Sequence, residues 1–317
     1  MNKCKLLLLT VVLGAFMTLH AQNLEDFISK YTSENGQKYM QPFADAFSAN
    51  LNSGLYHNSS IEKWGFQMYI GVVAQSAIIP TKSKYFMAKY DDPSSGLSGE
   101  IEAPTVFGPA EGPTVTHPDN GLSYVLPGGF DVDHMPLLMP QLTIGSVYGT
   151  DLTIRYTKMN IEDAGELDVF GWGIRHSINN YLDSIPVDIA IGYYNQYFKV
   201  GEYLDASSNI ISLQCSYNTS FVTFYGGLSY ETGKVKVQYD YSGIEPEVNS
   251  ESTEPGDKVE FDMDAANTIR ATLGITLNMG PFKVNGDYNF AKQNTVNVGI
   301  GFGINERERY RKSKELK

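Results

Sequence analysis

The chain has 317 residues, with 24 Lys or Arg against 36 Asp or Glu, and a formal net charge of −12. This acidic balance argues against nucleic-acid binding, because proteins that bind nucleic acids carry basic stripes or patches. The two cysteines, Cys4 and Cys215, leave one thiol in the mature chain if the N-terminus is removed, so an intrachain disulfide is excluded.

Residues 1–21 have the composition of a cleaved secretory signal peptide. Lys3 and Lys5 precede an apolar run from Leu6 to Met17, and the cleavage point falls at Ala21-Gln22. The run is shorter than the roughly 20 residues of a membrane helix. No later apolar run reaches that length, so if the protein enters a membrane, it must do so as strands.

Residues 22–60 contain a helical stretch, KYMQPFADAFSANL, at 38–51. Met40, Phe43, Phe47 and Leu51 recur at helical spacing and predict one apolar face. Two interpretations are open for this segment. It is either an amphipathic helix that closes one end of the following domain, or a plug that moves.

From residue 61 to 305 the dominant pattern has period two, which is typical of β-strands. In VNVGIGFGIN (296–305), aliphatic residues and Phe302 alternate with glycine and asparagine. Short Gly- or Asn-containing links such as Met279-Gly280-Pro281 and Glu231-Thr232-Gly233-Lys234 predict hairpin turns. The alternating runs lie near 63–75, 141–148, 151–158, 168–178, 186–198, 209–217, 220–230, 234–241, 268–278, 282–290 and 296–305.

A soluble sandwich and a membrane barrel both alternate in this way. Sandwich strands are shorter, near five or six residues, and their outer face is rich in charge. Here the polar face is mostly Gly, Thr, Ser and Asn, and each run has about the length that a tilted strand needs to cross a bilayer. We therefore predict an all-β fold, a transmembrane antiparallel β-barrel of about 12–14 strands with an N-terminal helical plug or hatch. Trp64 and Trp172, near run ends, fit an interfacial girdle, and the glycines of the last strand predict close packing in the lumen.

Three further segments do not read as wall strands. Residues 91–139 are rich in Pro and Gly and predict a long insert, with short strand pieces near 100–107 and 122–126. Residues 244–264 are strongly acidic and predict a solvated loop, extracellular if both termini are periplasmic. Residues 306–317 form a charged C-terminal tail.

Clusters that could carry chemistry are weak. Asp131-Val132-Asp133-His134 could hold a divalent cation, but a polar turn is the simpler interpretation. His176 shares a face with Phe170, Trp172 and Ile174, and no nucleophile motif accompanies it. We expect no enzymatic activity, no cofactor and no metal.

The predicted lumen is more informative. The strand register turns Arg155, Arg175 and Arg270 inward, because charge on the lipid face costs several kcal/mol. The same register turns Gln67, Tyr69, Lys236 and Asp287 inward. The arginines either pair with acidic groups of an insert, such as Asp131 or Asp133, or form a selectivity ring for anionic or amphipathic solutes. The candidate solute contacts are Arg155, Arg175, Arg270, Tyr69, Phe43 and Phe47.

The signal ending at Ala21-Gln22, the N-terminal helix and the PTVFGP stretch at 104–109 resemble an uncharacterised family of Gram-negative outer-membrane β-barrels. Its architecture is similar to that of the long-chain fatty-acid transporter family, which has an N-terminal hatch in the lumen. The resemblance implies an outer-membrane location, contact with outer-membrane lipid and passage of a small hydrophobic or amphipathic solute, gated by the N-terminal segment. The alternatives are a closed structural or adhesive barrel without transport, and a soluble periplasmic binding protein.

Overall fold

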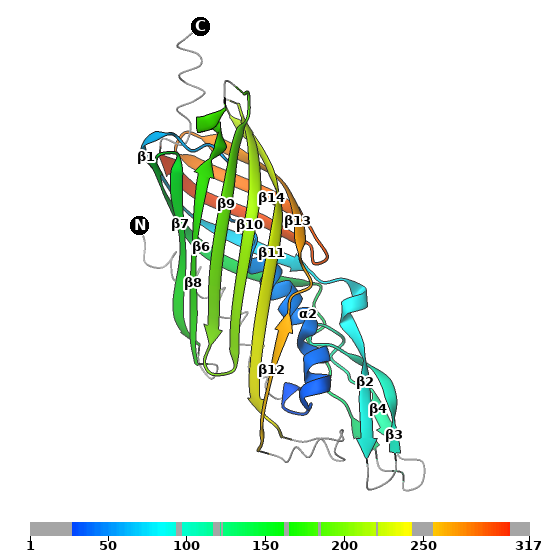
Figure 1. Cartoon of the computed structure of the whole chain (residues 1–317). Coiled ribbons are helices and arrows are strands. Elements are labelled where there is room, and N and C mark those ends of the chain that lie inside the picture. Colours follow the sequence, from blue (N-terminus) through cyan, green and yellow to red (C-terminus); the bar gives the residue numbers. More distant parts are fainter. Residues whose placement is uncertain are drawn as a thin grey trace.

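The wall is a closed antiparallel β-barrel. The computed structural model describes residues 27–92, 97–116, 121, 123–161, 165–182, 185–219, 221–242 and 256–304. Among these residues, ten strands form one ring, closed by the pairing of β10 with β11 (Figure 1). In order around the ring they are β10 (Leu204–Asn218), β9 (Asp188–Val200), β8 (Gly165–Ser177), β7 (Thr150–Ile161), β6 (His134–Val147), β1 (Trp64–Ile78), β15 (Thr295–Ile304), β14 (Phe282–Phe290), β13 (Ile269–Met279) and β11 (Val222–Asp240).

The barrel prediction is confirmed, but the expected 12–14 strands are too many. The runs at 220–230 and 234–241 are one strand, β11, because Thr232 and Gly233 continue the ladder with Asn209 and Ser208 of β10 instead of turning. The pieces expected near 100–107 and 122–126 fall at β3 (Leu97–Pro104) and β5 (Ser123–Val125). These strands pair with β2 (Tyr85–Asp92) and β4 (Thr114–Thr116), outside the wall.

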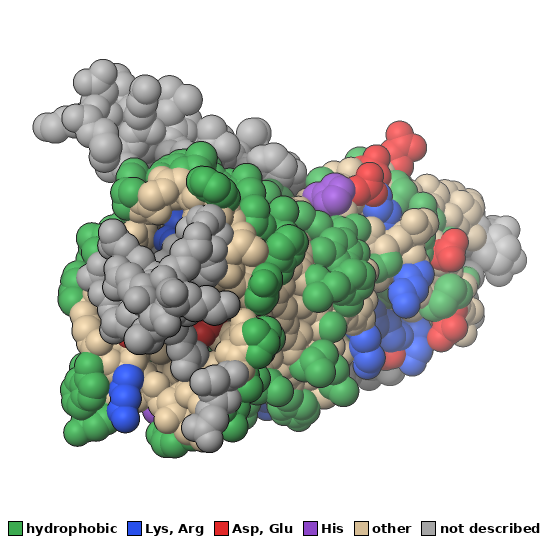
Figure 2. Space-filling model, turned by 90° about the horizontal axis from the view of Figure 1, so that it is seen from above, with side chains coloured by type: hydrophobic (Ala, Val, Ile, Leu, Met, Phe, Trp, Pro, Cys, Tyr) green, Lys and Arg blue, Asp and Glu red, His purple; other side chains and the backbone are tan. Residues whose placement is uncertain are grey.

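The outward face of the wall is apolar over most of its height. On β15, Val296, Val298, Ile300 and Phe302 point outward and are 37–55% exposed, while the residues between them are buried. From Val296 to Ile304 this row extends ~26 Å along the strand, or ~20 Å along the barrel axis at the usual tilt of about 40°, which is most of the ~25 Å apolar band of a membrane barrel. Figure 2 shows apolar side chains around the outer rim of one end, with charged side chains gathered at the far end.

Toward that far end, the two faces of the wall exchange their chemistry. On β11, the apolar residues Leu228 and Tyr230 are exposed on the outside. A few residues further along the same strand, the apolar residues Val235 and Val237 are instead buried on the inside. The prediction that Lys236 faces the lumen is therefore wrong. Its side chain is 43% exposed on the outer surface and its Nζ lies 2.7 Å from Glu260 of β12 (Lys258–Asp264).

The two ends of the barrel differ in their connections. One end, here called the turn end, carries the short links at 148–149 and 280–281, the 3₁₀ turn η2 (Ile178–Tyr181) and the last described residue, Ile304. The other, the insert end, carries the described residues between 79 and 133, with η1 (Thr81–Lys84) and the two hairpins, and the ends of β11 and β12 at Asp240 and Lys258 (Figure 1). The first described residue, Phe27, lies at the insert end against Phe130, with 5.8 Å between the ring centroids. The signal peptide, most of the acidic loop and both termini lie outside the described residues.

The expected N-terminal helix is α2 (Ser33–Leu51), which enters the barrel from the insert end. Its apolar side chains form a core with the inward-facing apolar residues of the wall near the insert end. The Phe47 ring meets Phe198 of β9 at 4.3 Å between centroids and stacks on Phe43 at 5.5 Å. No described helix is both long enough and apolar enough to cross a membrane.

Candidate functional site

The lumen is occupied along its whole length by residues 27–62, here called the lumen segment. At the insert end, the Tyr239 hydroxyl donates to the carbonyl of Tyr31 at 2.7 Å. Helix α2 then fills the half of the lumen nearer the insert end, here called the lower half. Residues 52–62 continue through the half nearer the turn end, here called the upper half. At the turn end, the next residue, Lys63, accepts from the backbone N–H of Gly149 at 2.9 Å. The segment therefore enters at one end of the barrel and leaves at the other.

Arg155 of β7 holds the C-terminal end of α2. The last turn of this helix contains no basic residue of its own, so its terminal carbonyls need donors from elsewhere. Arg155 Nη2 donates to the carbonyls of Ser53 (3.0 Å) and Gly54 (2.6 Å), and Nη1 to that of Leu51 (3.2 Å). A buried cation at this position both satisfies the carbonyls and complements the negative end of the helix dipole.

Arg270 binds the same segment on the insert-end side of that point and Arg175 on the turn-end side, but each also has a carboxylate on the wall. Arg270 Nη2 donates to the carbonyl of Ala49 at 2.8 Å and lies 3.0 Å from Glu231 of β11. Arg175 Nη1 donates to the carbonyl of Asn58 at 2.6 Å. Its Nε and Nη2 donate to the two carboxylate oxygens of Asp151. Both ion pairs are almost fully buried, which makes the loss of either partner costly.

These contacts bear out the inward orientation of all three arginines but not the partners expected for them. Asp131 and Asp133 lie in the insert outside the wall, where both carboxylates approach Lys84 Nζ, at 3.5 and 2.7 Å. The Lys84 ammonium, through its hydrogen bond, lowers the pKa of Asp133. The arginines instead bind backbone carbonyls of the lumen segment, and the carboxylates that pair with Arg175 and Arg270 are Asp151 and Glu231 of the wall.

The seam between the first and last wall strands contacts the lumen segment through Ser53. Its hydroxyl lies 3.0 Å from Asn297 Oδ1 of β15, and Gln75 of β1 donates to its carbonyl at 2.8 Å. The next residue, Gly54, has φ +62°, and a Cβ there would lie 2.5 Å from Val73 of β1. Sequence analysis missed this contact. The only signal was the pair of polar residues, Asn297 and Gln75, on the inner faces of strands at the two ends of the chain.

The tip of the Tyr69 side chain lies over the glycines of that seam. A Cβ on Gly301 would lie 2.6 Å from the Tyr69 ring, so the ring needs the bare backbone beneath it. On its other side the ring meets His57 of the lumen segment, with 4.1 Å between centroids. The close packing expected over the last strand's glycines is thus confirmed, and Tyr69 is a contact between wall and segment.

Phe43 and Phe47 do not join the arginines. They lie in the lower half of the lumen, in an apolar cluster with Phe107, Phe198 and the inner residues of β11. The six predicted solute contacts therefore divide into two groups, a polar one around residues 49–58 and an apolar one around α2. Between the groups, Asn50 Nδ2 donates at 2.7 Å to the carbonyl of Met135, in the half of β6 that does not pair with β7.

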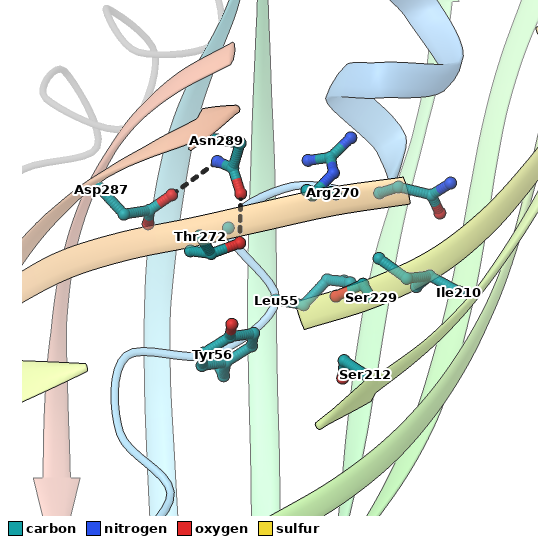
Figure 3. A pocket seen from close by; sticks show the side chains of 11 residues that line it. Leu55, Tyr56, Ile210, Ser212, Ser229, Arg270, Thr272, Asp287 and Asn289 are labelled. Carbon is teal, nitrogen blue, oxygen red and sulfur yellow. Dashed lines mark hydrogen bonds between the residues drawn. The ribbon is translucent and has the colours of Figure 1, made fainter. Parts of the chain in front are cut away.

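A small polar cavity lies beside the end of α2 (Figure 3). Its volume is about 10 Å³, enough for one water molecule. Asp287 forms part of its wall and accepts from Asn289 (2.7 Å), Asn297 (2.6 Å) and the Tyr225 hydroxyl (2.9 Å). Arg270 Nη1 lacks a hydrogen-bond partner among the described residues. The arrangement can bind small polar groups; it has no nucleophile paired with a base.

The structure also describes the two remaining candidates from the sequence, the possible metal site and His176. The described residues contain no group of three or more His, Cys, Asp or Glu placed to hold a metal ion. His176 points outward as predicted, and its ring nitrogens lie 2.8 Å from the Thr150 hydroxyl and 3.0 Å from the Tyr181 hydroxyl.

Comparison with solved structures finds other barrels at low similarity. A loop L8 deletion mutant of OmpT, an outer membrane protein of Vibrio cholerae, shares 11% identity at a TM-score of 0.28, covering 76% of this chain and 98% of that one. The outer membrane protease OmpT from Escherichia coli gives 6% and 0.33, covering 77% and 96%. The toluene transporter TbuX of Ralstonia pickettii gives 7% and 0.27, covering 82% and 98%.

No curated protein matches the sequence. A protein-family model does match, over residues 1–304, and its description is a family of unknown function, DUF6588. The likeness to the long-chain fatty-acid transporter family stays a prediction. Because the match covers nearly the whole chain, the protein belongs to the DUF6588 family.

Proposed function

We propose that this protein is an outer-membrane barrel that passes small hydrophobic or amphipathic solutes passively, with the lumen segment as its gate. The observation that carries the proposal is the way in which the segment is held. One continuous stretch closes the lumen, and in the upper half the wall grips mainly its backbone carbonyls. Water or a solute can take over such hydrogen bonds, so their net contribution to stability is limited, about 1 kcal/mol from a neutral donor and about 2 kcal/mol from an arginine.

The lining left behind by a displaced segment supports an amphipathic solute. Around α2 the wall offers Phe198, Val235 and Val237. Further toward the turn end it offers Arg155, whose hydrogen-bond acceptors in the described part of the chain are backbone carbonyls and glutamine amides. An open lumen would therefore join an apolar chamber to a passage with an unpaired cation, which suits a small molecule with an apolar body and an anionic end.

The connections support an orientation. Outer-membrane barrels have short periplasmic turns and longer extracellular loops. The turn end would then face the periplasm and the insert end the outside, with the solute entering beside α2.

The test is to lock the segment to the wall. In a Cys215→Ser background, Ser53→Cys with Asn297→Cys places two thiols where the side chains now touch. The matched control, Thr143→Cys with Thr153→Cys, links β6 to β7, where the two hydroxyls lie 2.9 Å apart. Flux of benzoate into liposomes is measured for both variants, oxidised and reduced, with glucose as the polar comparison.

We expect oxidation to abolish benzoate flux in the segment-to-wall variant, reduction to restore it, and the wall-to-wall control to be unaffected. Equal flux in the locked and unlocked forms would overturn the gate. Absence of flux in every form, for a properly folded barrel, would support the alternative of a closed structural or adhesive barrel. The tightly filled lumen is the observation that favours that alternative.

A further inference from the structure

A groove of about 500 Å³ lies on the outer surface of the wall, at the level where its chemistry changes. Phe170 and Tyr197 form its side toward the turn end and are 44% and 52% exposed. Its other side is charged. The charged lining residues are Asp168, Lys199, Asp205, Lys234, Lys236 and Asp262.

The register aligns these charges with alternating sign. Hydrogen-bonded partners run from β7 to β12 in one row, in which every lysine is followed on the next strand by an aspartate. The row is Lys158, Asp168, Lys199, Asp205, Lys236 and Asp262. The next row toward the turn end begins with Tyr156, Phe170 and Tyr197. On β7 to β9 a charged row thus lies directly against an aromatic one, as at a membrane–water boundary. On β10 to β12 the second row continues with Ser207, Lys234 and Asp264.

The charges in the groove are exposed or half-buried, and most are loosely paired. Lys199 Nζ is 3.9 Å from Asp205, and Lys234 Nζ is 4.0 Å from Asp264, both at the outer limit of an ion pair. Lys236 is held more closely, 2.7 Å from Glu260, but both side chains of that pair are also exposed, so a ligand has to displace only a surface pair. Asp168 and Asp262 have no ion pair within 4 Å among the described residues. Pairs this long and exposed are weak, so a ligand can displace them at little cost.

We propose that this groove binds the head group of a zwitterionic phospholipid, phosphatidylethanolamine. Adjacent strands are ~4.8 Å apart, a spacing that the two-carbon link between phosphate and ammonium matches. The phosphate lies against Lys199 and Lys236, the ammonium against Asp205 or Asp168, and the acyl chains continue over Phe170 and Tyr197. The lining holds three lysines and three aspartates, and this balance suits a zwitterion better than an anionic head group.

The experiment uses the full-length barrel purified in detergent and titrated with phosphatidylethanolamine, phosphatidylglycerol and lipid A, read by native mass spectrometry. Two variants alter the groove, Lys199→Gln with Lys236→Gln, and Asp168→Asn with Asp205→Asn. The control is Lys158→Gln, in the same charged row but outside the groove. Heat-dependent electrophoretic mobility checks that every variant has folded.

We expect phosphatidylethanolamine to bind about tenfold more tightly than phosphatidylglycerol, and each double variant to lose about that tenfold, since charge-assisted hydrogen bonds supply the difference. The control should bind like the parent. Equal binding of the two phospholipids overturns the proposal. So does tighter binding of lipid A or phosphatidylglycerol that increases when the aspartates are neutralised, because that result identifies an anionic-lipid site.

Discussion

The two halves of β11 differ in a way that explains much of the molecule. In the first half, Leu228 and Tyr230 point outward while Ser229 and Glu231 point into the lumen. In the second half the outward residues are Lys234 and Lys236, and the inward ones are Val235 and Val237. The backbone continues in one register, with side chains alternating between the same two faces. What changes is the surroundings. Near the turn end the outer face is apolar and the lumen is polar, whereas near the insert end the outer face is charged and the interior is a packed apolar core.

The same contrast separates two ways of holding the lumen segment. Around α2, burial of a side chain such as Phe47 contributes about 2–3 kcal/mol. Around residues 51–58, the contacts are hydrogen bonds to carbonyls, and water can replace the partner of each one when the segment moves, which limits their net contribution to about 1–2 kcal/mol each. The comparison predicts that the segment releases first from its turn-end half, while α2 stays packed.

The largest expected effect comes from reversing the inner face of the lower half. Val237→Lys buries an ammonium in the core around α2 and should lower the free energy of unfolding by about 4 kcal/mol. Gln238→Lys, the next residue on the outer face, pairs in register with Glu260 and should change little. Urea unfolding in lipid vesicles measures both. If the two lysines cost the same, the inner face here is not a core.

A smaller loss is expected from a charge on the outer face of the upper half. Leu228→Lys places an ammonium against lipid and should cost about 2–4 kcal/mol if the position lies near mid-bilayer. Gln238→Lys again serves as the control, on the same strand and the same face. The same unfolding assay applies. A cost near zero at Leu228 would mean that this part of the wall does not face lipid.

The next prediction concerns the polar half of the lumen. Arg155→Ala leaves the carbonyls of Leu51, Ser53 and Gly54 without their donor and should favour release of residues 51–58 by about 2 kcal/mol. Amide hydrogen exchange there should accelerate about thirtyfold, with exchange in the first turns of α2 unchanged. Thr157→Ala, on the same face of β7, should have no such effect. Acceleration spread evenly over the segment would contradict release from one half.

The smallest effect is expected at the solvated start of α2. Hydrogen bonds from Lys89, and next from Lys38, lower the pKa of Glu34. A carboxyl whose pKa is lowered by folding stabilises the folded state above its unfolded pKa, about 4.3. That contribution is lost as pH falls through the lower folded value. Glu34→Gln should therefore speed exchange in the first turn of α2 at pH 7 by less than fivefold, since exposed pairs contribute under about 1 kcal/mol. Below the folded pKa, parent and variant should exchange alike, and a difference that persists there would contradict this account.

Alternation was enough to predict the barrel, its strands and the inward arginines, because a period-two pattern survives whichever solvent lies outside. It could not say which face is which. At residues 231–234 the apolar positions shift by one, from Leu228 and Tyr230 to Val235 and Val237. That shift resembles the break between two strands, so a hairpin was predicted there and Lys236 was turned inward. The real cause is a change of environment along one strand.

The partners of the arginines were beyond sequence reasoning for a different reason. A backbone carbonyl leaves no trace in a sequence pattern. The wall carboxylates Asp151 and Glu231 do appear in the sequence, but only the folded ring places them beside Arg175 and Arg270, and Asp131 and Asp133 look equally suitable. Counting charges therefore favoured the wrong acceptors. The contact of Ser53 with Asn297 likewise joins residues 244 positions apart, and no local pattern connects them.

The path of residues 27–62 constrains the order in which the molecule can be built. A chain that enters a closed ring at one end and leaves at the other cannot be laid in afterwards from the side. Either β1 and β15 zip together around a segment already in place, or its free N-terminal end must travel the length of the finished ring. In the first case Ser53, which contacts both closing strands, helps to set the position in which β1 and β15 pair in the last step of barrel assembly.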